Sequence, residues 1–163
     1  MFLYLLSALS AAGILTHLWR DKSPCTRGRV AEVALLYILP CNVGLTGILS
    51  FLGHAFRVDE IARGIGWPPG SPFQFEVAVA NLAFGVLGLV CIGRRGGFWL
   101  ATGLGYSVFL LGAAYGHIRD IFLSHNSAVY NAGPVLYLGD IAMPILILTL
   151  LFLYGRGESR PPA

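Results

Sequence analysis

The chain has 163 residues, of which 56% are hydrophobic and 12% are charged, and its formal net charge is +3. Ordinary soluble domains carry roughly 25% charged residues, so this composition excludes a water-soluble globular domain. The small net charge gives no indication of nucleic-acid binding, and we predict none.

The apolar residues fall into five long blocks. A helix needs about 20 apolar residues to cross a hydrocarbon core of roughly 30 Å, and the blocks approach or exceed that length. The first block lacks the basic segment that begins a signal peptide, so we expect it to remain as a helix. We predict an all-α integral membrane protein, one helical domain over residues 1–163, with spans at residues 2–19, 30–56, 75–92, 98–118 and 135–154.

Polar residues and prolines mark particular points along the first two blocks and the last. His17 and Glu32 lie near loop arginines, and we expect them to be interfacial partners of those charges. Asn42 lies in the middle of the second block, where an amide more often bonds a neighbouring helix than a ligand. Pro40 and Pro144 each remove a backbone donor, so they predict kinks in the second and fifth spans.

The segment before the third block has its own pattern. Between residues 58 and 67, apolar residues alternate with charged ones, which predicts a short amphipathic segment in the membrane interface. Ser71 is predicted as the N-cap of the third helix, with Pro72 at its first position. Gln74 would complete a capping box with Ser71.

Small residues recur at helix-packing spacing in the third and fourth blocks. Such stripes let helix backbones approach closely in lipid, so we predict helix packing, including contacts to a homo-oligomer or a larger membrane complex. The stripes are Asn81, Gly85 and Gly88 on the third helix, and Gly105, Gly112 and Gly116 on the fourth.

Four successive blocks bring ionisable side chains to one end of the predicted bundle: His54, Glu76, His117, Asp120 and Asp140. Asp140 lies roughly 9–14 Å beyond the start of its helix, where an unpaired carboxylate needs a partner or a proton. The first block contributes no charge to this group. We therefore predict that helices two to five form a four-helix bundle and that helix one is peripheral.

Histidine with carboxylate suits a divalent metal such as zinc, iron or manganese, and helical bundles build metal sites from facing helices. We therefore predict His54, Glu76, His117, Asp120 and Asp140 as metal ligands. No HExxH or Glu-x-x-His motif supports this set, and polar residues at the end of a bundle more often form a hydrogen-bonded or solvated network. Haem held by His54 and His117 and a proton relay are further alternatives.

Three functions stay open: a membrane enzyme or metal-binding protein, a proton-coupled transporter that uses Asp140, and an accessory subunit. The stretches GWPPGSPFQFEVAVANLAFGVLG and GYSVFLLGAAYGHI contain Glu76, Asn81 and His117 and cover about a quarter of the chain. They resemble a family of small bacterial multi-pass membrane proteins of uncharacterised function. The resemblance implies a bacterial inner membrane and supplies no chemistry.

The basic residues of the loops are unevenly divided, eight to one side and three to the other. Basic residues are enriched in cytoplasmic loops, so the first, more basic side is predicted to be cytoplasmic and the N-terminus to be outside. The first side holds Arg20, Lys22, Arg27, Arg29, Arg94, Arg95, Arg156 and Arg160, and the second holds Arg57, Arg63 and Arg119.

This orientation is tested by reporter fusions after Arg29, Arg63, Arg95 and His125. We expect the four fusions to report inside, outside, inside and outside in turn, because each pair is separated by one span. Cytoplasmic exposure of the fusion at Arg63 would contradict the predicted topology.

Overall fold

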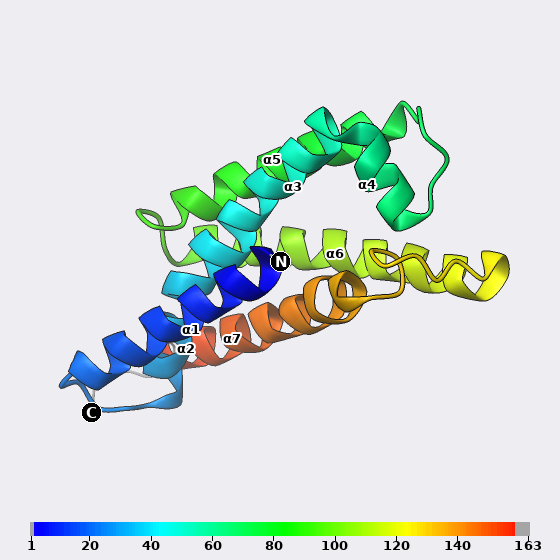
Figure 1. The fold of residues 1–163 in the computed structure, drawn as a ribbon. Coiled ribbons are helices and arrows are strands. Elements are labelled where there is room, and N and C mark those ends of the chain that lie inside the picture. Colours follow the sequence, from blue (N-terminus) through cyan, green and yellow to red (C-terminus); the bar gives the residue numbers. More distant parts are fainter. Residues whose placement is uncertain (1, 159–163) are drawn as a thin grey trace.

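The computed structural model describes residues 2–158, and Arg160, one of the basic residues counted above, lies outside them. Within this part of the chain the elements are helical, and five helices are long and apolar enough to cross a membrane, as predicted. In chain order they are α1 (Phe2–Arg20), α2 (Arg27–Ile38), η1 (Leu39–Leu45), α3 (Thr46–Phe56), α4 (Val58–Ile65), α5 (Phe73–Val90), α6 (Gly97–Ser124), η2 (Val135–Ala142) and α7 (Met143–Glu158) (Figure 1).

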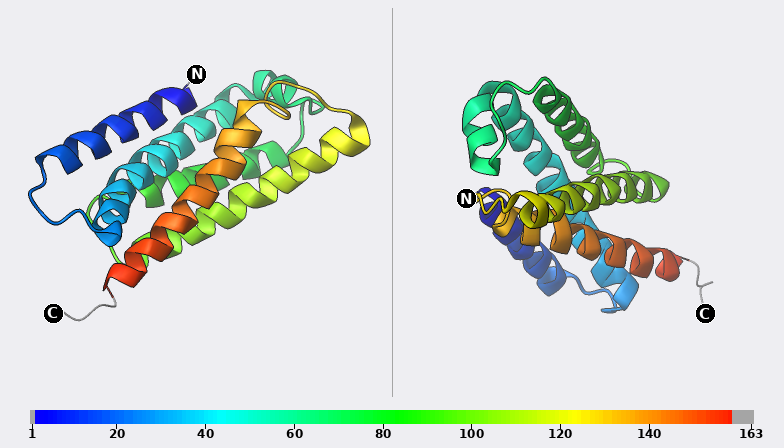
Figure 2. Two further views of the ribbon diagram at one scale, coloured as in Figure 1. Left: turned by 90° about the horizontal axis from the view of Figure 1, so that it is seen from below. Right: turned by 90° about the vertical axis from the view of Figure 1, so that its right-hand side faces the viewer.

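The second span, which comprises α2, η1 and α3, is the axis of the fold. Its first half packs against α7 and its second half against α5, while α6 packs against α7 and η2 and also touches α5 (Figure 2). These contacts close the predicted four-helix bundle. Helix α1 packs on α2 and η1 from outside, and only 11% of its apolar window is buried, the lowest share of the five spans. The peripheral position of the first helix is confirmed.

Helix α6 is longer than the apolar block that predicted it. It continues six residues past Ile118, to Ser124. His125 follows as the C-cap, adopts the left-handed conformation with φ 53° and donates its N–H to the Asp120 carbonyl. Residues 119–124 contain no glycine or proline, so nothing in their sequence ends the helix. The predicted span stopped at Ile118 because it followed the apolar block, and charged residues come next.

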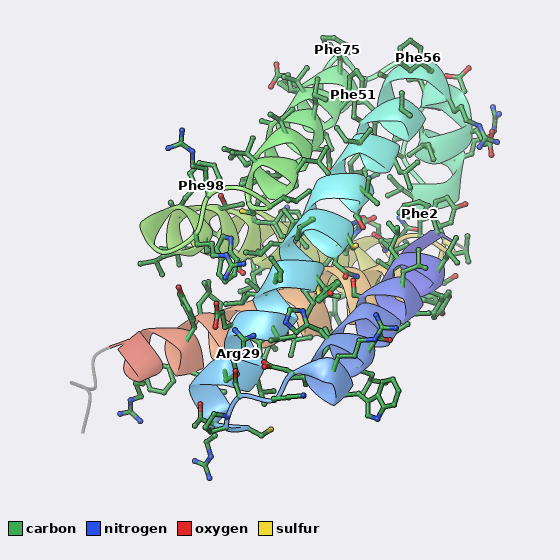
Figure 3. The ribbon with its side chains drawn as sticks, turned by 90° about the vertical axis from the view of Figure 1, so that its left-hand side faces the viewer. Phe2, Arg29, Phe51, Phe56, Phe75 and Phe98 are labelled. Atoms are coloured by element: carbon green, nitrogen blue, oxygen red, sulfur yellow. The ribbon has the colours of Figure 1, made fainter. Side chains whose placement is uncertain are left out.

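Large apolar side chains cover the outside of the helices. Phe56 is 74% exposed and Phe75 is 61% exposed at the neighbouring ends of α3 and α5, and Arg29 lies at the opposite end of the second span (Figure 3). A water-soluble protein would not present so many exposed aromatic and aliphatic groups, which lie on α1, α3, α5, α6, η2 and α7. Lipid is the solvent that this surface fits.

The second and third spans meet backbone to backbone. A Cβ atom built on Gly47 would lie 2.6 Å from the Asn81 carbonyl oxygen, and one on Gly85 would lie 2.8 Å from the Ile48 nitrogen. A Cβ on Gly88 would collide with the backbone of Gly44. The predicted packing role of the stripe on the third helix is confirmed, because only glycine permits this approach.

The stripe on α6 does not pack within the chain. Gly112 and Gly116 face open space, and a Cβ on Gly105 would meet only the Phe84 ring, at 3.4 Å. Helix α6 instead turns its Gly103 and Tyr106 face inward. At 100° per residue the stripe lies roughly 130° from the middle of that face, so it points away from the core of the bundle.

Both prolines lie in or beside segments of π-helix, the wide form in which hydrogen bonds span five residues. Pro40 lies within η1, and Pro144 is the second residue of α7, just after η2 ends at Ala142. These π-helical segments also contain two of the buried polar residues of the spans, Asn42 and Asp140. The prolines therefore widen the helices at the points where polar side chains enter the core.

The amphipathic segment forms α4, with Ala62 and Ile65 buried. The predicted capping box at the start of α5 is wrong. Pro72 is the N-cap and the helix start has no side-chain cap, because Gln74 is buried and donates its Nε2 to the Val58 carbonyl at 2.8 Å. Docking of α4 on the start of α5 thus outweighs the local cap.

The two glycine stripes differ in packing, so we predict that substitutions in them have opposite effects on stability. Gly88→Ala should lower the free energy of unfolding by about 1–3 kcal/mol, because the added methyl has no room against Gly44. Gly112→Ala should raise it by up to about 1 kcal/mol, because alanine loses less backbone entropy in a helix. Thermal or denaturant unfolding in one detergent compares them, and equal stabilities would contradict the crossing.

Candidate functional site

The predicted polar end of the bundle contains one close pair. Asp140, on η2, is 7% exposed, and its Oδ2 lies 3.7 Å from the Nε2 of His117 on α6. The π-helical start of the fifth span places the carboxylate inside the bundle rather than toward lipid. This is a carboxylate and an imidazole held together within membrane-spanning segments, where ionisable groups are rare.

The second ring nitrogen of His117 is also held. Its Nδ1 lies 2.7 Å from the Oδ1 of Asn131, which is completely buried in the turn before η2. The Nδ2 of Asn131 donates to the Asn126 carbonyl at 2.8 Å. Sequence reasoning missed both asparagines. They stand in the connection between α6 and η2, where asparagine ordinarily indicates only a turn.

Asp120 belongs to the rim of this group and not to the pair. Its carboxylate accepts a hydrogen bond from the Asn126 Nδ2 at 2.6 Å, and the same nitrogen lies 2.8 Å from the Ile65 carbonyl at the end of α4. The Tyr130 N–H donates to the Gly64 carbonyl at 3.0 Å. The loop between α6 and η2 is thus tied to α4, which covers this end of the bundle.

His54 and Glu76 do not join the pair. His54, on α3, is half-buried, and its Nδ1 is a buried atom without a hydrogen-bond partner, whereas Glu76 is exposed on α5. The ends of α3 and α5 lie apart from those of α6 and η2, with α4 between them (Figure 1). Among residues 2–158, no group of three His, Cys, Asp or Glu side chains could hold a metal ion. The predicted convergence of five ligands is therefore not found.

A second polar layer crosses the middle of the membrane. The Asn42 side chain accepts a hydrogen bond from the Ser10 hydroxyl at 2.6 Å and donates to the Ser7 oxygen at 3.0 Å, both on α1. The Tyr106 hydroxyl donates to the Asn42 carbonyl at 3.3 Å. The expected bond from Asn42 to a neighbouring helix is confirmed, and it ties the middle of α1 to the bundle.

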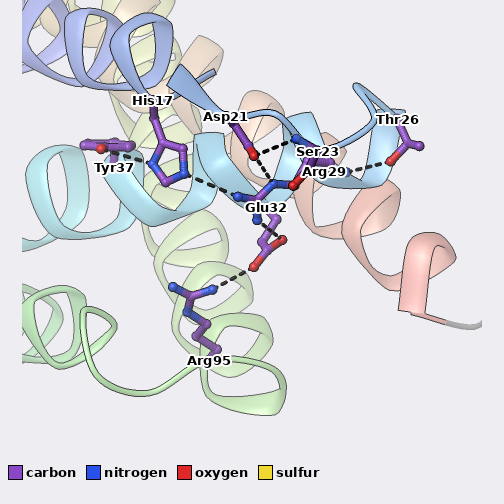
Figure 4. A network of polar contacts seen from close by, with 8 residues as sticks. All are labelled: His17, Asp21, Ser23, Thr26, Arg29, Glu32, Tyr37 and Arg95. Carbon is purple, nitrogen blue, oxygen red and sulfur yellow. Dashed lines mark hydrogen bonds and ion pairs between the residues drawn. The ribbon is translucent and has the colours of Figure 1, made fainter. Parts of the chain in front are cut away.

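The opposite end carries an ion-pair network centred on Arg29 (Figure 4). The guanidinium lies 2.7 Å from the Asp21 and Glu32 carboxylates, and Arg95 lies 2.6 Å from Glu32. His17 approaches both Arg29, at 3.3 Å, and the Tyr37 hydroxyl, at 3.2 Å. The expectation that Glu32 and His17 partner arginines is confirmed. Both belong to the same network, because each contacts Arg29.

The network lowers the pKa of Asp21. The backbone N–H of Ser23, followed by the Ser23 side chain and Arg29, lowers the pKa of Asp21 from 3.8 to about 2. The Ser23 N–H donates to the Asp21 Oδ1 at 3.0 Å. Because Asp21 follows α1, Glu32 is on α2 and Arg95 precedes α6, the network clamps three helices at the membrane surface.

The chain belongs to a family of unknown function (DUF6790), which matches residues 1–160. Over 85 residues, 52% of its length, it is 35% identical to NAD(P)H-quinone oxidoreductase chain 6 from Nostoc sp.. The match covers 41% of that protein, so the chain spans less than half the length of this relative. No solved structure matches the chain. The resemblance to a family of uncharacterised membrane proteins is confirmed.

Proposed function

We propose that the protein exchanges protons inside the membrane through the His117–Asp140 pair, as a proton-coupled carrier or as the proton-handling part of a larger assembly. The observation that carries the proposal is a carboxylate only 7% exposed in an apolar span, with an imidazole nitrogen 3.7 Å away. With the N-terminus outside a bacterial inner membrane, as the loop charges and the resemblance predict, the pair lies in the outer half of the bilayer.

Physical chemistry limits what such a pair can hold. An ionised carboxylate away from water costs several kcal/mol unless an opposite charge or hydrogen bonds compensate it. The pair meets this requirement in two ways, as a neutral carboxylic acid beside a neutral imidazole or as a carboxylate beside an imidazolium. Both states contain the same number of protons and differ only in which of the two groups holds the shared one.

A divalent metal such as zinc, iron or manganese is the alternative occupant, and a membrane enzyme would be the corresponding function. The geometry supports it less, because a structural zinc ion takes four protein ligands and a catalytic one takes three. Asp120, the nearest further candidate in sequence, is engaged by Asn126. Haem held by His54 and His117 gains no support, since His54 is not part of the group.

Infrared difference spectroscopy across a pH range tests the proposal on protein in lipid vesicles. We expect a protonated-carboxyl band that titrates reversibly and disappears in Asp140→Asn. In His117→Gln the band should remain but titrate at another pH, because the coupled base is lost. Asp59→Asn is the matched control, since Asp59 is exposed on α4, and it should leave the band unchanged.

Two results would contradict proton exchange at this site. One is a titrating band that survives in Asp140→Asn, and the other is the absence of any titrating buried carboxyl in the wild type. Elemental analysis of the same samples decides the alternative. Stoichiometric metal in the wild type that is lost in both His117→Gln and Asp140→Asn would favour a metal site.

Membership of a membrane complex is a second candidate function. The relative from Nostoc sp. is named as one chain of an oxidoreductase. The glycine stripe on α6 gives this candidate a surface, because Gly112 and Gly116 face open space on the outside of the bundle. A small-residue stripe there would allow a helix of another subunit or a second copy to approach closely.

This candidate predicts the behaviour of the protein extracted in a mild detergent. The wild type should run as an assembly larger than one chain, and Gly112→Leu should release the monomer without lowering its melting temperature. Gly93→Leu is a matched control, because Gly93 also faces open space but lies in a loop. A wild type that is monomeric at all concentrations in native membranes would exclude the assembly.

A further inference from the structure

The orientation of the Asn131 amide is determined by its partners. Its Nδ2 faces the Asn126 carbonyl at 2.8 Å, and a carbonyl oxygen can only accept a hydrogen bond. The reversed amide would set two oxygens against each other at that distance. The Oδ1 therefore faces the His117 Nδ1, at 2.7 Å.

This orientation decides which ring nitrogen of neutral His117 carries the proton. An amide oxygen is an acceptor, so the Nδ1 beside it must be the donor. A neutral imidazole has one N–H, and its other nitrogen has a lone pair. The Nε2 of neutral His117 is thus an acceptor, and it is the atom that faces the Asp140 carboxyl.

We propose that Asn131 is a positioning residue that holds neutral His117 in the Nδ1-protonated tautomer, so that Nε2 is ready to take the proton of Asp140. In this step the O–H bond of the Asp140 carboxyl breaks and an Nε2–H bond forms, which leaves a carboxylate beside an imidazolium. The other tautomer would place an N–H against the carboxylic acid and could not accept its proton. The proton transfer from Asp140 rests on the proposed function, whereas the assignment of the His117 tautomer does not depend on it.

The surroundings keep this arrangement in place. Asn131 is completely buried, and the residue that orients it, Asn126, accepts the Ala128 N–H at 3.1 Å through its own Oδ1. The Nδ2 of Asn126 reaches both Asp120 and the end of α4. Each polar atom of the two asparagine side chains thus has a partner, and neither amide can reverse without losing hydrogen bonds.

Other titratable groups near the pair are engaged elsewhere. The Tyr106 hydroxyl, close enough to Asp140 to interact electrostatically, donates to the Asn42 carbonyl. Asp120 is hydrogen-bonded to Asn126, and Arg119 is exposed. The distance of 3.7 Å exceeds that of a hydrogen bond, so transfer requires the two side chains to approach by roughly 0.5–1 Å.

Nitrogen-15 NMR of histidine-labelled protein in lipid vesicles measures the tautomer directly. His117→Gln identifies the His117 signals among those of the four histidines. At a pH where the ring is neutral, we expect the wild type to show Nδ1 protonated and Nε2 bare, as a single tautomer. A ring protonated at Nε2 in the wild type would overturn the proposal without any variant of Asn131.

The variants test whether Asn131 is the cause. Asn131→Ala should lose the single tautomer, because it removes the oxygen that accepts from Nδ1. Asn81→Ala is the matched control, since Asn81 is also buried but donates to Val77 within its own helix. An unchanged tautomer in Asn131→Ala would overturn the positioning role.

The two proposals fail in different ways. If the tautomer is as expected but Asp140 does not titrate in the infrared measurement, proton exchange fails and the tautomer assignment stands. If Asp140 titrates but neutral His117 carries its proton on Nε2, the positioning role and the direct transfer to Nε2 fail, while a titrating carboxyl at Asp140 stands.

Discussion

A polar group inside a bilayer has no water to bond, so it must find its partner within the protein. This constraint explains how the peripheral helix is held. Helix α1 buries little surface, and no hydrophobic effect draws helices together in lipid. Two serines of α1 bond the Asn42 side chain instead, and the Tyr106 hydroxyl satisfies the carbonyl of the same residue. Asn42 thus links the second span to α1 through its side chain and to the fourth span through its backbone carbonyl.

The same constraint places the pair at the other polar level. Asp140 cannot face lipid, and the π-helical start of the fifth span turns it toward His117 on α6. The backbones of η1 and α3 pack directly against that of α5 at their glycines. Their ends therefore meet neither α6 nor η2 at this level, and α4 fills the space between the two groups (Figure 1). Two of the five predicted ligands meet as a consequence.

The sequence predicted what depends on composition and spacing. Length and hydropathy predict the five spans. A polar residue alone in an apolar block predicts that Asn42 bonds a neighbouring helix, and the spacing of Gly85 and Gly88 predicts close packing of the third span. Such patterns do not say which face of a helix turns inward, so the spacing of Gly105, Gly112 and Gly116 predicts a packing face but not that this face points away from the bundle of its own chain.

The asparagines of the site could not be predicted for a different reason. Asn131 acts through the direction of its amide, which depends on the carbonyl of Asn126 in a turn whose path the sequence does not specify. The π-helical segments share this limitation, because proline predicts a lost hydrogen bond but not whether the helix bends or widens. Local signals were similarly overridden at Gln74, where contact with α4 replaced a cap.

The two charged ends of the molecule differ in how tightly their groups are held, and this difference indicates where exchange can occur. At the basic end, Arg29 contacts two carboxylates at 2.7 Å each, and the Asp21 pKa of about 2 keeps its acid ionised at neutral pH. Such contacts are already closed, and they hold the helices together without any need to move a proton. The His117–Asp140 pair is longer, at 3.7 Å, and is buried. In the proposed exchange one proton moves between its two groups, while Asn131 holds the imidazole on the other side. Contacts already closed at the basic end and a pair that must shorten at the other end are consistent with the proposed exchange at His117 and Asp140.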